Sequence, residues 1–313
     1  MSTMKAVRIH EYGASDVLTY ENAPLPVPGE GEILVRVHAT TVNPLDIAIR
    51  SGYMANYFNH SLPLILGTDV SGTVEDLGPN TNSFSLGDEV YARAGVTRDG
   101  SYAEFVLVNA ADIAAKPQSL DHAHAAALPH VTLTAWQALF ELGNLRKGQT
   151  VLIHGAAGGV GHIAVQLAKW RGANVIGTAS QNIDLIENLG VEQAIDYSKT
   201  AFEDAVQEVD MVLDTIGGDT QERSWSTLKR GGILVSIVEA PSEEIATNYG
   251  VRQAMVFTAP PIAETLTKVA ELVNAGQIQP VVSMVLPFDD VKNAHQIVEK
   301  KHTRGKIALQ VAP

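Results

Sequence analysis

A glycine-rich segment is the part of this sequence best suited to bind a phosphate group. It reads GAAGGVG from Gly155 to Gly161, after an apolar, β-branched run at 151–153 and before apolar residues with helical spacing. A strand, a tight turn and a helix in this order aim backbone N–H groups and a helix N-terminus at a pyrophosphate. Gly158 would let the backbone approach the phosphates, and Gly161 would let the helix pack on the strand. We therefore predict a dinucleotide-binding loop, although Ala156 stands where the G-x-G-x-x-G pattern has its first glycine.

The residues after the next strand-like run bear on which dinucleotide binds. In NAD-binding proteins a carboxylate at the end of the second strand binds the adenosine ribose, and it repels the 2′-phosphate of NADP. Here Ala179 occupies that position, and Ser180 can hydrogen-bond a phosphate. The pattern favours NADP(H) over NAD(H). NAD(H) stays as the alternative, because Asp184 is close by and the loop has no obvious lysine.

Composition limits the possible classes of function. The 313 residues are 45% hydrophobic, which is enough for two domains, each with its own core. The 22 basic and 35 acidic residues give a net charge of −13, which disfavours nucleic acids and anionic membranes as partners. The absence of cysteine excludes disulfides and thiolate zinc sites. No apolar run approaches the roughly 18 residues of a membrane span, and residues 1–13 do not resemble a signal peptide, so we expect a cytoplasmic protein.

The elements that position these residues change in kind along the chain. Short strand-like runs bounded by proline and glycine occupy the first third, which predicts a barrel-like domain. From residue 150 onward strands and helices alternate through six strands, which predicts a doubly wound parallel sheet. The tail at 281–311 returns to strand, helix and strand, and we expect it to rejoin the first domain. The expected boundaries are 1–124 with 276–313 for the first domain and 125–275 for the second.

Several motifs together resemble one family. They are NPLD at 43–46, LGTDVSG at 66–72, GDEV at 87–90, GSYAE at 100–104 and the run from Gly148 to Lys169. The chain resembles the zinc-free quinone oxidoreductase (zeta-crystallin-like) branch of the medium-chain dehydrogenase/reductase superfamily. The resemblance implies an α/β protein with a GroES-like β-barrel catalytic domain and a Rossmann cofactor domain. It also implies a homodimer that binds a small-molecule substrate.

The resemblance further implies hydride transfer without a metal. Zinc-dependent members hold their catalytic metal with cysteine, histidine and a further cysteine or acid, whereas the matching positions here are Asn43, Thr68 and Pro129. Zinc stabilises the alkoxide that forms during hydride transfer, so a zinc-free enzyme suits acceptors that spread the charge themselves, such as quinones and enones. Asn43 and Tyr53 are the predicted catalytic residues, as amide and phenol donors. Their simpler interpretations are a turn before Pro44 and a core aromatic.

The predicted cofactor-binding residues come partly from the loop and partly from the resemblance. They are Thr132, Ala157, Gly158, Gly159, Val160, Thr178, Ser180, Tyr197, Ile216, Val238 and Phe257. No metal site is predicted, because histidines two positions apart on a helix, as at 122 and 124, do not share a face. Two alternative functions remain: an enoyl or alkenal reductase of the same superfamily, and a non-catalytic nucleotide- or RNA-binding, crystallin-like protein.

Overall fold

The strands and helices of this chain group into two units in the computed structural model, which describes residues 2–256, 262–301 and 303–312. The first unit comprises Met1–His130, Pro261–Ala275 and Pro280–Pro313, and the second comprises Val131–Pro260 and Gly276–Gln279. The C-terminal strands group with the first unit. Helix α9 (Ile262–Asn274) also groups with the first unit, whereas the sequence-based boundaries placed it in the cofactor domain.

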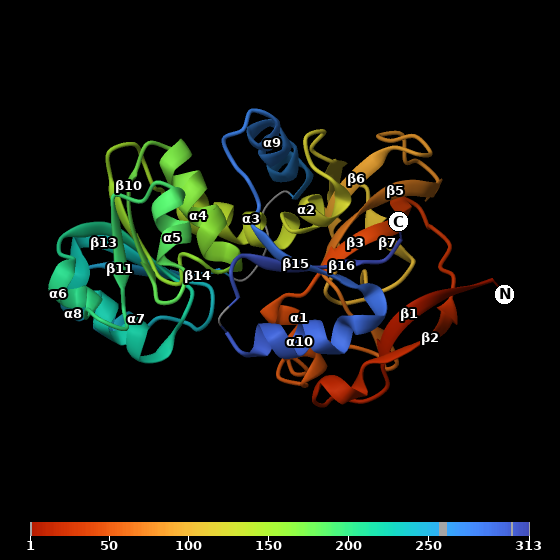
Figure 1. The fold of residues 1–313 in the computed structure, drawn as a ribbon, viewed down its shortest axis with the longest axis horizontal. Coiled ribbons are helices and arrows are strands. Elements are labelled where there is room, and N and C mark those ends of the chain that lie inside the picture. The colour runs from red at the N-terminus through yellow and green to blue at the C-terminus, as the bar shows by residue number, and fades with distance from the viewer. Residues whose placement is uncertain (1, 257–261, 302, 313) are drawn as a thin grey trace. The chain divides into compact units, whose positions relative to one another are not determined.

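The first unit is built on β-sheets (Figure 1). One sheet has the order β2-β1-β4, and a seven-stranded sheet has the order β15-β16-β3-β5-β6-β8 with β7 also paired to β3. The strands of these two sheets are β1 (Thr3–Ile9), β2 (Thr19–Pro24), β3 (Glu32–Thr41), β4 (Leu64–Ile65), β5 (Asp69–Leu77), β6 (Glu89–Arg93), β7 (Phe105–Asn109), β8 (Ile113–Ala115), β15 (Val282–Pro287) and β16 (Lys306–Gln310).

Buried aliphatic side chains hold this unit together. One cluster lies within the larger sheet and includes Ile33, Val35, Val70 and Val106, which are at most 2% exposed. Burying side chains of this size contributes about 1.5–3 kcal/mol each. The helices of the unit are α1 (Pro44–Arg50), α2 (His122–Ala126), α9 and α10 (Val291–Glu299). Pro129 separates α2 from α3 (Pro129–Trp136), because proline fits the first turn of a helix but cannot continue the helix before it.

The second unit contains a six-stranded parallel sheet. Its order is β11-β10-β9-β12-β13-β14, so the first strand in sequence lies in the middle, as in a doubly wound dinucleotide-binding fold. The strands are β9 (Thr150–Ile153), β10 (Asn174–Ala179), β11 (Gln193–Asp196), β12 (Val209–Asp214), β13 (Leu228–Ser236) and β14 (Arg252–Met255). The six predicted strands are confirmed.

Helices cover both faces of this sheet because its strands are apolar on both sides. They are α4 (Gly159–Trp170), α5 (Ile183–Asn188), α6 (Phe202–Ala205), α7 (Gly218–Ser224) and α8 (Glu243–Tyr249), with a π-helix at Gln137–Leu142. Figure 1 shows α4 and α5, in green, on one face and α7 and α8 on the other. In the described part of the chain, no helix is both long and apolar enough to cross a bilayer.

Candidate functional site

The glycine-rich loop connects β9 to α4 by a turn that requires glycine. Gly155 has a φ of +60°, in the left-handed region that favours glycine. A Cβ added to Gly161 would lie 2.2 Å from the Gly155 carbonyl oxygen, so no other residue fits without moving the loop. Gly158 donates its N–H to that same oxygen at 2.9 Å. The predicted role of Gly161 in close packing is therefore confirmed.

The start of α4 offers the backbone groups that a phosphate needs. Gly158 is its N-cap and supplies no side chain to bind the free N–H groups of the first turn. Those N–H groups, together with the positive end of a helix of 12 residues, form an anion-binding surface. A Cβ added to Gly158 would lie 3.2 Å from the Gly155 oxygen, and Gly158 has no other such neighbour within 4 Å among the described residues. The loop therefore suits a pyrophosphate. Ala157 lies in it, and Gly159 and Val160 are the first two residues of α4; that these three residues bind the cofactor stays a prediction.

The end of β10 lacks a carboxylate in the position that discriminates between the cofactors. Ala179 is its last residue and is only 5% exposed. The Ser180 hydroxyl donates to the Tyr197 phenolic oxygen at 3.0 Å, and Tyr197 is 48% exposed. Two adjacent, accessible hydroxyl groups thus stand beside the loop of the second unit, where they are able to hydrogen-bond a ligand.

The other predicted cofactor residues differ in accessibility. Ile216 and Val238, just after β12 and β13, are 50% and 48% exposed, so both present apolar surface at the carboxyl edge of the sheet. Thr178 is buried and its hydroxyl lies 3.1 Å from His154 Nδ1, which directs it into the core. Thr132 is buried with no hydrogen-bond partner for its hydroxyl among the described residues. Phe257 falls outside the residues described here.

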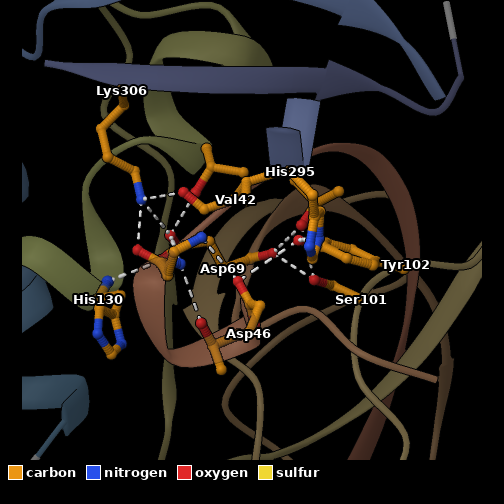
Figure 2. Close-up of polar contacts among 12 residues, drawn as sticks. Val42, Asp46, Asp69, Ser101, Tyr102, His130, His295 and Lys306 are labelled. Atoms are coloured by element: carbon orange, nitrogen blue, oxygen red, sulfur yellow. Dashed lines mark hydrogen bonds and ion pairs between the residues drawn. The ribbon is translucent and has the colours of Figure 1, made fainter. Parts of the chain in front are cut away.

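A buried carboxylate organises the polar residues of the first unit (Figure 2). Asp69 Oδ2 accepts hydrogen bonds from Thr41 Oγ1 at 2.5 Å and Asn43 Nδ2 at 2.8 Å, and Lys306 Nζ lies 3.3 Å away. Asp69 Oδ1 accepts from the His130 backbone N–H at 2.7 Å. Burial by itself would raise the pKa of Asp69, but the Lys306 ammonium and these donors outweigh it and lower the pKa. Asp69 is therefore an ionised, fully bonded carboxylate.

Asn43 is held in place on both ends of its amide. Its Nδ2 donates to Thr68 Oγ1 at 3.0 Å and to Asp69 Oδ2 at 2.8 Å, and its Oδ1 accepts from Lys306 Nζ. Asn43 is 1% exposed. Since an amide has two N–H donors, neither remains for a substrate oxygen in this arrangement. Thr68 Oγ1, which accepts from Asn43, retains its own O–H proton for donation.

A second buried carboxyl group lies next to this network. Asp46 Oδ2 accepts from the Asn43 backbone N–H at 2.8 Å and from the Tyr102 hydroxyl at 3.4 Å. Asp46 Oδ1 is buried with no partner among the described residues. Burial is the main cause that raises the pKa of Asp46 from 3.8 to about 7, and the charge of Asp69 adds to it.

From Asp46 a chain of hydrogen bonds continues to a charged pair. Tyr102 Oη lies 3.1 Å from His295 Nε2, and His295 Nδ1 lies 3.2 Å from Arg50 Nη1. Arginine only donates, so Nδ1 accepts and Nε2 carries the proton that binds Tyr102. Burial, with the nearby Arg50 charge, lowers the pKa of His295 to about 3, which keeps the ring neutral. Arg50 in turn pairs with Glu299.

Tyr53 does not belong to either of these networks. It follows α1, is 78% exposed, and lies in a loop with the exposed Tyr57. Its predicted interpretation as a core aromatic is wrong, because its ring is in solvent. Its predicted role as a donor stays a prediction.

The residues at the family's metal positions do not fit zinc. Asn43 and Thr68 offer an amide and a hydroxyl that are bonded to each other, and Pro129 begins a helix. Zinc prefers thiolate, imidazole and carboxylate ligands. Within the described residues, no group of three or more histidine, aspartate, glutamate or cysteine side chains is placed to hold a metal.

Sequence reasoning missed the partners of Asn43. Asp69 lies inside the quoted motif at 66–72, so its position next to Thr68 was a usable signal. Lys306 carries no local signal, because it is 263 residues away from Asn43 along the chain. The chain from Tyr102 through His295 to Arg50 was also missed, since each residue comes from a different segment.

Comparisons with known proteins agree with this architecture. Residues 29–118 match the model of the alcohol dehydrogenase GroES-like domain, and residues 189–309 match that of the zinc-binding dehydrogenases. The chain is 35% identical to the mitochondrial NAD(P)H oxidoreductase RTN4IP1 of Mus musculus, covering 99% of this chain and 90% of that protein. It is 34% identical to 2-methylene-furan-3-one reductase of Solanum lycopersicum, covering 100% and 80%.

Among solved structures, the quinone oxidoreductase from Coxiella burnetii superposes with a TM-score of 0.92 at 34% identity, covering 99% of this chain and 100% of that one. Sequence relatives of above 30% identity over nearly the whole chain, the two matching domain models and this superposition all point the same way. The chain therefore belongs to the quinone oxidoreductase branch of the medium-chain dehydrogenase/reductase superfamily.

Proposed function

We propose that this protein is an NADPH-dependent, zinc-independent oxidoreductase that transfers a hydride to a quinone or an activated enone. The observation that carries the proposal is the network of Asn43, Thr68 and Lys306 around Asp69. Asn43 and Thr68 match the metal-ligand positions of zinc-dependent relatives, and the Thr68 hydroxyl and the Lys306 ammonium in this network support binding of an acceptor oxygen without a metal. Such groups orient an acceptor and stabilise modest charge at its oxygen, but they do not replace a Lewis acid.

The second unit supports the choice of cofactor. Bound NADPH would supply the hydride. The N–H groups at the start of α4 would hold its pyrophosphate, and Gly158 would leave room for it. The Ser180 and Tyr197 hydroxyls would bind the 2′-phosphate, which no carboxylate at position 179 repels.

In this proposal the donors of the first unit have distinct roles. Thr68 donates its hydroxyl proton to the acceptor oxygen, while Asn43 fixes the orientation of Thr68 by donating to it. Lys306 keeps Asp69 ionised and adds positive potential near the acceptor. Tyr53, on an exposed loop, provides a second donor when substrate binds.

An enoyl or alkenal reductase of the same superfamily is the alternative enzyme, and one relative is named an NADPH-dependent alkenal/one oxidoreductase. The tomato relative is named as a reductase of 2-methylene-furan-3-one, which is itself an activated enone. A non-catalytic RNA-binding role is disfavoured by the net charge of −13.

One panel of acceptors tests the proposal. NADPH oxidation would be followed with quinones, alkyl enones and simple ketones as acceptors. The reverse reaction would be followed as NADPH formation from ethanol and NADP⁺. Each assay would be run with and without a chelator. We expect turnover with quinones and enones that persists when the chelator is present. Elemental analysis should find no stoichiometric zinc. Deuterium from C4-labelled NADPH should appear at the β-carbon of the reduced enone. Oxidation of ethanol with inert quinones and enones would refute it.

The proposal also includes a homodimer and a cytoplasmic location. Strand β14 is the edge of the six-stranded sheet, and an unpaired edge is a template for pairing with a second copy. The mouse relative is named as mitochondrial, so fractionation of the source cells is the direct test of location.

A further inference from the structure

Arg93 is an arginine of the first unit that the mechanism above leaves unused. It is the last residue of β6, and it lies directly opposite Asp69 in the antiparallel register of β5 and β6. Residues opposite each other in such a pair carry their side chains on the same face, with Cβ atoms about 5 Å apart. Arg93 therefore projects on the side of the sheet where Asp69 meets Asn43 and Lys306.

The guanidinium of Arg93 lacks a partner among the residues that the structure describes. Its Nε is shut off from solvent without an acceptor, and no hydrogen bond or ion pair to Arg93 occurs among the described residues. Four other arginines of the same unit differ in this respect, since each contacts a glutamate: Arg8, Arg36, Arg50 and Arg98. Arg93 as a whole is only partly exposed, so water does not fully replace the missing partner.

The carboxylate of Asp69, opposite Arg93 in the strand register, already has other partners. Asp69 Oδ2 already accepts from Thr41 and Asn43 and pairs with Lys306, and its Oδ1 accepts from the His130 N–H. Burial lowers the pKa of Arg93, against the fields of Asp69, Asp112 and Asp46, yet a guanidinium remains protonated in proteins. The result is a partly buried cation without a counter-ion, which is costly unless a ligand supplies one.

A carboxylate is the ligand group that matches this cation. The planar guanidinium fork binds a carboxylate by two parallel hydrogen bonds, and charge-assisted bonds of this kind are about twice as strong as neutral ones. A neutral quinone or enone oxygen would satisfy one N–H but would leave the charge uncompensated. The site therefore favours an acceptor that carries a negative group besides its reducible double bond.

We propose that Arg93 forms an anion subsite in the first unit, and that the preferred hydride acceptor is an enone or quinone bearing a carboxylate. This inference rests on the proposed function and names the substrate class of the same site. Arg93 binds the substrate's carboxylate and selects for it, and it takes no part in the transfer of hydride.

A pair of matched acceptors tests the subsite. 4-Oxo-2-pentenoate and its methyl ester share one enone and differ in charge, so the ratio of their kcat/KM values isolates recognition of the carboxylate. Arg93→Met keeps a long, unbranched side chain but removes its charge, and we expect it to lower the carboxylate-to-ester ratio by about 10- to 100-fold, the worth of a charge-assisted bond. Arg93→Lys should recover part of the ratio. Arg146→Met removes an exposed positive charge from the other unit and should leave the ratio unchanged.

A binding measurement separates failure of the subsite from failure of the proposed function. Levulinate, the saturated analogue, would be titrated calorimetrically into wild type and Arg93→Met without NADPH. We expect the dissociation constant to rise at least about tenfold in the variant. If wild type reduces neither acceptor, the proposed function fails, and the titration still decides on the subsite. The inference would be overturned if Arg93→Met had the same carboxylate-to-ester ratio of kcat/KM as wild type. It would also be overturned if levulinate bound wild type and the variant equally well, or bound neither of them.

Discussion

Replacing Asp46 by asparagine should change how the stability of this protein depends on pH. Asp46 is 0% exposed, and burial raises the pKa of its carboxyl from 3.8 to about 7 in the folded protein. A group whose folded pKa is raised stabilises the fold fully below its unfolded pKa, and this contribution is lost as the pH rises through the folded pKa. The difference of about three pH units corresponds to about 4 kcal/mol, at about 1.4 kcal/mol per unit.

Asparagine removes this cost because it stays neutral at every pH. Its side-chain oxygen still accepts from the Asn43 N–H, so the start of α1 keeps its bond. We expect the free energy of unfolding of Asp46→Asn, minus that of wild type, to rise by about 2 kcal/mol from pH 5 to pH 7 and to level off above pH 7. Urea unfolding followed by circular dichroism at each pH measures this difference.

The exposed Asp76 provides a matched control, since Asp76→Asn removes one negative charge without touching a buried group. A difference curve for Asp46→Asn that is as flat as the control curve between pH 5 and pH 8 would refute the argument. It would mean that Asp46 is ionised at little cost, for example through water at its free Oδ1.

Three further predictions address the cofactor loop, cofactor choice and the buried ion pair. Gly161→Ala should abolish NADPH binding in a fluorescence titration, because its Cβ would lie 2.2 Å from the Gly155 oxygen; undiminished affinity would exclude this loop. Ala179→Asp should weaken NADPH relative to NADH by repelling the 2′-phosphate, and an unchanged ratio of dissociation constants would contradict the assignment of β10. Lys306→Met should lower the free energy of unfolding by about 3–5 kcal/mol by leaving the Asp69 charge unpaired, and adding Asp69→Asn should restore much of it; equal stability of the single variant and wild type would argue against the pair.

Local sequence was enough to predict the second unit. A β-branched run, a glycine turn and a helical pattern are each decided by neighbouring residues, so the loop before α4 and the six strands could be predicted without tertiary information. Sequence alone also showed that position 179 carries alanine in place of an acidic residue, and that positions 43 and 68 carry residues that are poor zinc ligands. These conclusions depend on which residue type stands at one position of a known pattern.

Sequence alone did not reveal which polar groups remain free to act. Asn43 was expected to donate to substrate, but Thr68 and Asp69 accept both of its N–H groups. The partner on its carbonyl side is Lys306, 263 residues along the chain, which only the pairing of β16 with β3 brings there. Likewise, the unpaired charge of Arg93 results from competition, since the carboxylate opposite it already has other partners. Hydrogen-bond donors and acceptors are shared out among residues that meet only in the folded chain, so their availability is a property of tertiary structure.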